Sequence, residues 1–321
     1  MTSLARRALV FGLMTALAHI SVHAADSNHP IRLIVPTPPG SAADALARAV
    51  STPWAKSSGR PIVVENIVGA GTSIGTAKLT RSPNDGLTLA IISSNHTINP
   101  WVYKGLPFDA IADITPIAMI GSVPAMLVAN NKVAANTPKE LEQLAKSAET
   151  PLAEGLVSGS AYQMASEVFK EQAGITTNRI PYKGSAQILN DLLGGTLDIA
   201  IINAQLAAPQ VAAGKLKGLA VTTSVRAGMA PQIPTLRESG YPNYEVEVWL
   251  ALAGPAGLSA INIAARRAEF ETALSAPEMK QAMESQGILP IAKRPDEILP
   301  FLKAELERNR AVIERVGMTA D

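Results

Sequence analysis

The feature that most constrains the fold is an alternation of short aliphatic runs with helical patterns along most of the chain. Short aliphatic runs bounded by turn residues are typical of buried strands. They cover residues 31–35, 61–65, 87–93, 116–120, 125–129, 155–157, 177–181, 198–203, 216–222 and 245–252. Helical patterns cover 42–56, 75–80, 138–148, 161–173, 185–193 and 206–213, and the chain from Asn262 onward is predicted to be helical, ending in a long helix over 296–316. This alternation predicts an α/β fold of mostly parallel sheets with helices on both faces.

The first strand leads into an elbow and a helix, which together predict an anion site made of backbone. Prolines at positions 36, 38 and 39 cannot continue a strand, and Gly40 tolerates the φ angle of a sharp turn. Ser41 and Asp44 form a Ser-x-x-Asp capping box. The N–H groups and dipole of such a helix terminus favour a negative charge.

A second elbow of this kind follows the strand at 155–157. Ser158 and Gly159 form the turn, and Ser160 with Gln163 forms a Ser-x-x-Gln capping box. A single such turn is usually an ordinary capped helix. Ligands of open α/β sheets, however, collect at the carboxyl ends of strands. One capped turn in each half of the chain therefore predicts two helix termini facing each other across a cleft.

The length of the chain predicts two lobes. Removing the first 24 of the 321 residues leaves 297, which is more than one core usually serves. We expect a discontinuous first lobe from residues 25–123 and 245–321, and a second lobe from residues 124–244. The hinge segments are predicted near 114–130 and 224–245. Two crossings between two α/β lobes give the geometry of a ligand clamp.

The first 24 residues read as a signal peptide. Arg6 and Arg7 precede an apolar run over residues 8–20, and Ala24 ends a small-x-small cleavage site. The run is too short to span a membrane. Because the chain has no cysteine, a lipid anchor and disulfides are excluded. We therefore expect a periplasmic protein, cleaved after Ala24. Its 26 remaining basic residues (28 less 2) against 27 acidic residues give no basic excess, so nucleic acid is not an expected partner.

The histidine count argues against most enzyme classes. His19 and His23 leave with the signal peptide and His29 lies at the mature N-terminus, so only His96 is inside the fold. A zinc site or a catalytic cysteine has no residues to build it, and no Gly-x-Ser-x-Gly elbow presents a serine. We expect no enzyme, metal or cofactor. An exported α/β hydrolase that uses His96 is the alternative.

Polar residues at other strand ends are expected to line the cleft and decide specificity. Ser94, Asn95 and His96 follow the strand at 87–93. Tyr182 follows the strand at 177–181 and can donate a hydrogen bond or offer a ring face. Asn203 ends the strand at 198–203. The glycine-rich loop at 69–75 does not match the dinucleotide spacing, and close backbone packing beside the cleft is the better interpretation.

Taken in order, these motifs resemble the Bug family, the periplasmic receptors of tripartite tricarboxylate transporters. The matching residues run through the whole mature chain. They are Pro38, Pro39, Gly40 and Asp44; Glu65, Asn66 and 69–71; Phe108, Asp109, Pro116 and Ile117; 158–160, Glu167, Phe169 and Lys170; 181–184, 191–195 and Asp198; and Arg226, Pro234, Thr235, Trp249 and 254–257.

The resemblance implies a two-lobed Venus-flytrap fold without catalysis. It implies a ligand that is a small carboxylate, or an aromatic or amino acid bearing one, held by backbone groups of two loops and partly through water. The implied site residues are Thr37, Pro39, Gly40, Ser41, Ala43 and Asp44 in the first loop and Ser158, Gly159, Ser160 and Tyr162 in the second. The implied partners are membrane components of a tripartite transporter, and we expect a monomer. A sensory co-receptor for the same ligands fits the sequence equally well.

The chain departs from the family pattern at four positions near these loops. The family usually has glycine at Ser41, Thr72 and Val157, and histidine at Gln163. Ser41 would add a hydroxyl to the carboxylate seat, whereas Val157 would stiffen or block the second loop. The ligand class therefore carries over better than the ligand identity.

Overall fold

The structure is a computed structural model that describes residues 29–244 and 246–320. The predicted signal peptide and its cleavage site lie outside the described residues. No helix in the described part of the chain is long and apolar enough to cross a membrane.

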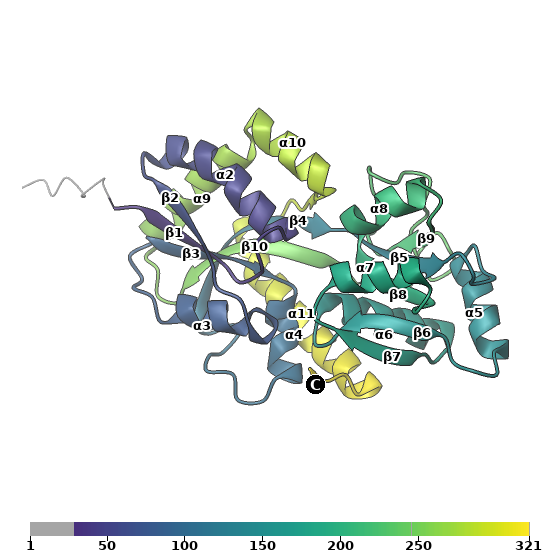
Figure 1. The fold of residues 1–321 in the computed structure, drawn as a ribbon. Helices are drawn as coiled ribbons and strands as arrows, with labels where there is room; N and C mark the ends of the chain where they lie inside the picture. The colour runs from purple at the N-terminus through teal and green to yellow at the C-terminus, as the bar shows by residue number, and fades with distance from the viewer. Residues whose placement is uncertain (1–28, 245, 321) are drawn as a thin grey trace, which may run out of the picture.

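Two separate sheets divide the molecule (Figure 1). The six-stranded sheet has the order β11-β4-β10-β3-β1-β2, and the five-stranded sheet has the order β7-β6-β8-β5-β9. We call the six-stranded sheet with its helices the first lobe, and the five-stranded sheet with its helices the second lobe. The strands are β1 (Ile31–Val35), β2 (Ile62–Asn66), β3 (Thr88–Ser93), β4 (Ile114–Val123), β5 (Ala125–Asn130), β6 (Ala153–Val157), β7 (Asn178–Tyr182), β8 (Ile199–Asn203), β9 (Leu216–Val221), β10 (Val248–Pro255) and β11 (Leu289–Pro290).

Helices cover both sheets, as the alternating pattern predicts. The first lobe carries α2 (Ala42–Ser58), the short 3-10 helix η1 (Ala70–Thr72), α3 (Ser73–Thr80), α4 (Asn95–Val102), α9 (Ala260–Leu274), α10 (Pro277–Gln286) and α11 (Pro295–Val316). The second carries α5 (Pro138–Ser147), α6 (Ala161–Ala173), α7 (Ser185–Gly194) and α8 (Ala204–Ala212). Helix α2 packs against α9, with the rings of Trp54 and Phe270 in edge contact at 4.8 Å.

The α/β fold was predicted correctly, but the sheets are mixed rather than mostly parallel. Strand β1 pairs in parallel with β2 and β3, and β6 with β7 and β8, whereas β10 is antiparallel to β3 and β5 is antiparallel to β8. The reason is that the chain crosses from one lobe to the other. Only Pro124 separates β4 of the first sheet from β5 of the second. A strand that enters a lobe from the junction must run against strands that end at the junction.

The register places the carboxyl ends of the central strands at this junction. Ser93, the last residue of β3, pairs with Leu250 near the start of β10. Asn203, the last residue of β8, pairs with Ala125 at the start of β5. The turns that follow β3 and β8 therefore lie where the two lobes meet.

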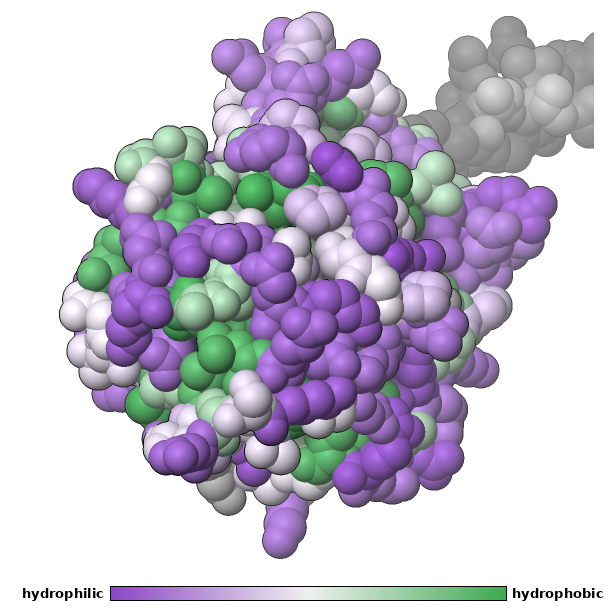
Figure 2. Space-filling view, turned by 90° about the vertical axis from the view of Figure 1, so that its right-hand side faces the viewer, coloured by the Kyte–Doolittle hydropathy of each residue, from purple (hydrophilic) through white to green (hydrophobic). Residues whose placement is uncertain are grey.

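Helix α11 (yellow in Figure 1) runs from the first lobe past the junction and contacts both α4 and α6. Arg315 near its end forms a two-pronged ion pair with Glu171 of α6. The outer face of the second lobe is mostly hydrophilic, with small groups of apolar residues (Figure 2). The crossing from β4 to β5 and the contact of α11 with α6 thus join the two lobes.

Candidate functional site

The N-terminus of α2 is closed by its own side chains. The Ser41 hydroxyl accepts a hydrogen bond from the Asp44 N–H at 3.2 Å, as the capping box predicts. The buried Asp44 carboxylate accepts from the Gly40 N–H at 2.9 Å and from the Asn66 amide at 2.9 Å. Burial opposes its charge, but hydrogen bonds from Arg48, Gly40 and Asn66 hold the pKa of Asp44 below its ordinary value. The carboxylate thus fills part of the terminus that the sequence assigns to a ligand.

Two N–H groups of this terminus remain open. Within residues 29–244 and 246–320, the N–H groups of Ala42 and Ala43 have no hydrogen-bond partner. The Thr37 and Ser41 hydroxyls share a hydrogen bond at 2.6 Å and Pro39 is exposed, so the elbow lies at the surface beside these groups. The groups of α2 that can bind an anion are therefore the N–H groups of Ala42 and Ala43 in its first turn.

The N-terminus of α6 is capped in a similar way. The Ser160 hydroxyl accepts from the Gln163 N–H, and the Gln163 side chain accepts from the Gly159 N–H at 2.8 Å. Gly159 has φ 67°, and a Cβ atom there would lie 3.2 Å from the Cβ of Ala320. Gln163 thus accepts from the residue before the N-cap Ser160, so only the Ser160 half of the predicted capping box is present. Val157 is half-buried, as is Ser158.

A buried ionic group holds α6 on its sheet. Glu154 of β6 is 1% exposed and accepts hydrogen bonds from the Lys170 ammonium at 2.8 Å and the Thr177 hydroxyl at 2.5 Å. Lys170 also contacts Glu167 at 3.1 Å. Because buried charges are stable only when paired, this group fixes the position of α6 and with it the capped turn.

Asn95 connects the two lobes at this turn. It is the first residue of α4 in the first lobe, and its side-chain oxygen accepts a hydrogen bond from the N–H of Ala161, the first residue of α6, at 3.1 Å. The other end of the Asn95 amide faces the Gly71 carbonyl at 3.4 Å. The structure therefore brings Asn95 and the second predicted loop together.

The loop at residues 69–72 has an unusual backbone. All four residues have positive φ, including the two that are not glycine, Ala70 (43°) and Thr72 (87°). Residues other than glycine seldom have positive φ, and β-branched residues such as threonine have it most rarely. The buried side chain of Asn99 holds the loop by donating to the Gly71 carbonyl at 2.7 Å and to the Ser73 hydroxyl at 2.9 Å. The close packing predicted for this loop is present, and it lies beside Asn95.

Two residues predicted to line the cleft are instead buried. His96 is 1% exposed, stacks on Phe108 with ring centroids 6.0 Å apart, and lies 2.6 Å from the Ala110 carbonyl through Nε2. Since a carbonyl accepts, Nε2 must carry the proton. Burial lowers the pKa of His96, so the ring is neutral at pH 7. Ser94 is 3% exposed. The cause is α4, a helix that the sequence analysis missed because Pro100 lies within it.

The remaining predicted residues belong to the second lobe. The Asn203 amide donates to the Tyr162 hydroxyl over a long 3.5 Å, and its oxygen caps α8 by accepting from the Gln205 N–H. Burial raises the pKa of Tyr162, which keeps its hydroxyl proton available for donation. The Tyr182 hydroxyl, by contrast, donates to Asp191, which raises the pKa of Tyr182 to about 12. Tyr182 can therefore offer a ligand its ring rather than its proton.

Tyr103 and Ala320 also reach the second turn, and no sequence signal identified them. The Tyr103 hydroxyl lies 2.9 Å from the point a Cβ on Gly71 would occupy and 3.5 Å from that point on Gly159. A side chain at Gly71 would therefore collide with Tyr103 inside the first lobe, whereas at Gly159 the tighter contact is the one with Ala320. The glycines are visible in the sequence, but their shared neighbour Tyr103 is not.

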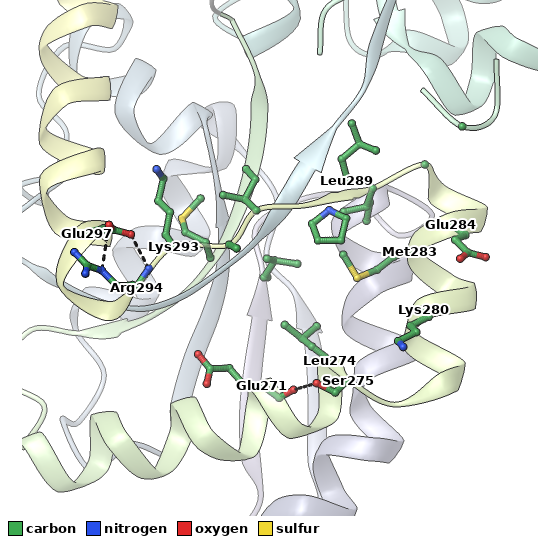
Figure 3. Close-up of a pocket in the computed structure, with 18 of the residues that line it drawn as sticks. Glu271, Leu274, Ser275, Lys280, Met283, Glu284, Leu289, Lys293, Arg294 and Glu297 are labelled. Carbon is green, nitrogen blue, oxygen red and sulfur yellow. Dashed lines mark hydrogen bonds and ion pairs between the residues drawn. The ribbon is translucent and has the colours of Figure 1, made fainter. Parts of the chain in front are cut away.

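A cavity of about 1230 Å3 lies elsewhere, among α9, α10 and β11 of the first lobe. Figure 3 shows Leu274, Met283 and Leu289 around it, with the Arg294–Glu297 ion pair at one side. Gly228 and Met229, from the segment between β9 and β10, also line the cavity. Its lining is largely apolar and contains neither predicted loop. In the described parts of the chain, no three His, Asp or Glu side chains cluster to hold a metal.

Comparison with known proteins decides the family. The model of the tripartite tricarboxylate transporter family receptor matches residues 46–318. The chain belongs to this family. The receptor is 32% identical to protein BugT of Bordetella pertussis, over 98% of each chain. Its fold is that of the periplasmic binding protein BugD, with a TM-score of 0.79, 26% identity, and coverage of 90% of this chain and 98% of that one.

A second solved structure carries a ligand. R. palustris Rpa4515 was solved with adipate; it is 27% identical, with a TM-score of 0.81, over 92% of this chain and 99% of that one. The receptor is thus a member of a family of periplasmic solute-binding proteins and not an enzyme, as the sequence predicted. The buried, neutral His96 is consistent with that assignment.

Proposed function

We propose that the receptor captures a small organic carboxylate between its lobes and delivers it for uptake. One carboxylate is held by the first turns of α2 and α6. The observation that carries this proposal is the pair of capped helix N-termini at the lobe junction of a chain in this family. The open N–H groups of Ala42 and Ala43 on one side, and the Ala161 N–H on the other, supply the donors.

The strength of such a seat is in the range that a receptor needs. A helix terminus contributes about 0.3–1 kcal/mol to binding an anion when exposed and about 2 kcal/mol when partly buried. Hydrogen bonds to a charged group contribute about 1.5–3 kcal/mol each. Three such bonds give about 4.5–9 kcal/mol before the cost of ordering the ligand, so the upper part of this range, with the helix-terminus contribution added, is needed to approach the about 8 kcal/mol of micromolar binding. Tyr162, the second residue of α6, adds a further neutral donor.

The proposal includes the domain arrangement and the route. Residues 25–123 and 245–321 form one lobe, residues 124–244 form the other, and the segments near 114–130 and 224–245 are the hinge. The signal peptide is removed after Ala24 and the mature monomer works in the periplasm. It passes its ligand to the membrane components of a tripartite transporter. In the rival sensory role the same ligand would be presented to a signalling partner.

The experiment is a thermal-shift screen of the mature chain with mono-, di- and tricarboxylates, aromatic acids and amino acids. Adipate, the ligand of Rpa4515, goes first. Each acid is paired with its neutral amide as a matched control. A ligand that binds only the folded state raises the melting temperature by mass action. We expect at least one acid to raise it while its amide does not. A flat response to every acid would contradict the proposal.

A further inference from the structure

We propose that Asn95 sets the affinity threshold for ligands, because its amide oxygen accepts the hydrogen bond from the Ala161 N–H that a ligand carboxylate oxygen would accept. The inference rests on the proposed function, since it assigns the same Ala161 N–H to Asn95 and to the ligand in turn. A ligand must displace the Asn95 oxygen before both lobes can close on it.

Asn95 lies where the two lobes meet. Asn95 directly follows the turn at the end of β3, where Ser94 donates its N–H to the Trp249 carbonyl at 3.1 Å. This bond joins the start of α4 to the hinge strand β10. From there the Asn95 oxygen reaches into the other lobe and accepts from the Ala161 N–H at 3.1 Å. A side chain of one lobe therefore completes the helix terminus of the other.

The neighbours of the Asn95 amide fix its orientation. Its nitrogen faces the Gly71 carbonyl at 3.4 Å, which can only accept, so the oxygen is the atom turned toward Ala161. The Gly71 carbonyl is itself fixed by the Asn99 amide at 2.7 Å. The buried Asn99 is held in turn by Ser73. The strained loop at 69–72 thus supplies a rigid frame that presents the Asn95 oxygen to the opposite lobe.

A ligand oxygen would have to replace the Asn95 oxygen as the acceptor from the Ala161 N–H. The Asn95 oxygen is a neutral acceptor that is already in place. A neutral ligand oxygen offers the helix terminus nothing better and must also give up its freedom of motion. A carboxylate oxygen forms a charge-assisted bond that is roughly twice as strong and is favoured by the helix dipole. A carboxylate therefore offsets the loss of the Asn95 bond, whereas a neutral oxygen does not.

Two substitutions of Asn95 separate this role from others. Asn95→Ala removes a competitor that the best acid and its amide must both displace, so the affinity of each should rise by a similar factor of about tenfold, or ~1.4 kcal/mol. Asn95→Asp places a permanent carboxylate at the seat and should weaken binding of the acid by about 100-fold or more. Asn190→Ala, an exposed position on α7, is the matched control and should leave both affinities unchanged.

The measurement is titration calorimetry with adipate and adipamide, or with the acid and amide that the thermal-shift screen selects. Small-angle scattering of the empty proteins follows the closure, and Asn95→Ala should be more open than the parent. If the parent binds the acid but Asn95→Ala gains affinity for neither the acid nor its amide, the inference is wrong and the proposed function stands. If the parent binds no acid, both are wrong.

Discussion

The Asp44 carboxylate accepts a hydrogen bond from the Gly40 N–H at 2.9 Å, so α2 carries its own anion at the terminus predicted to bind one. The same carboxylate receives the Asn66 amide and pairs with Arg48. These contacts hold the elbow and leave the first turn of α2 as its open part. Asp44 is therefore a residue that shapes the seat, while the ligand would meet the N–H groups beside it.

Replacing Asp44 should cost stability. Asp44→Ala leaves the Gly40 N–H and the Asn66 amide without their acceptor, and we expect the free energy of unfolding to fall by about 1–2 kcal/mol. Denaturant unfolding followed by circular dichroism measures it. Arg48→Ala is the control: Arg48 is 56% exposed, and removing an exposed ion-pair partner should change the free energy by less than about 1 kcal/mol. Equal losses in the two variants would contradict this role of Asp44.

The serine caps of α2 and α6 could be predicted from the sequence because each serine lies three positions before the N–H that it accepts from, whereas the return bonds of Asp44 and Gln163 go to Gly40 and Gly159 and not to the N-cap residues. Most strands and helices could also be predicted. The Asn95–Ala161 contact could not be predicted, since it joins residues 66 positions apart in different lobes. His96 reads as a site residue in sequence, but α4 turns it toward Phe108 and Ala110. The direction of β10 depends on the crossing between lobes, which no local pattern records.

His96 predicts an acid-sensitive fold. Burial lowers the pKa of its imidazole, so below the unfolded-state value of 6.5 the unfolded chain binds a proton that the folded chain rejects. This contribution is absent above pH 6.5 and grows as the pH falls, by at most about 1.4 kcal/mol per pH unit. Glu142, whose pKa is lowered to about 2, loses its contribution only as the pH falls below 4.5.

His96→Gln retains a donor for the Ala110 carbonyl but cannot be charged. We expect it to be less stable than the parent at pH 7.5, because the stack on Phe108 is lost, but to lose less stability between pH 6.5 and 5. Urea unfolding at several pH values gives both numbers. Parallel pH curves for the two proteins would mean that His96 does not titrate on unfolding.

The strained loop predicts a substitution that increases stability. Thr72 has φ 87°, a conformation that costs a β-branched residue about 1–3 kcal/mol and glycine very little. After the greater entropy of glycine in the unfolded chain and the loss of the 3.3 Å hydrogen bond from the Asn99 amide to the Thr72 hydroxyl are subtracted, Thr72→Gly should raise the free energy of unfolding by at most about 1 kcal/mol. Thr272→Gly, on helix α9, is the matched control and should lower it by about 0.3 kcal/mol. A loss of stability in Thr72→Gly would show that the loop is not strained.

The central claim is that N–H groups of the two helix termini bind the ligand, and proline tests it without disturbing the helices. Position N1 tolerates proline, and the residues before it, Ser41 and Ser160, have the extended backbone that proline requires. Ala42→Pro and Ala161→Pro each delete one N–H of the seat. Ala260→Pro makes the same change at the start of α9, away from the junction.

The decisive measurement is the calorimetric dissociation constant of the best acid for these three variants. We expect Ala42→Pro and Ala161→Pro each to weaken binding by about tenfold or more, the value of one charged hydrogen bond, and Ala260→Pro to bind like the parent. Undiminished affinity in both seat variants, with melting temperatures near that of the parent, would contradict the two-terminus seat.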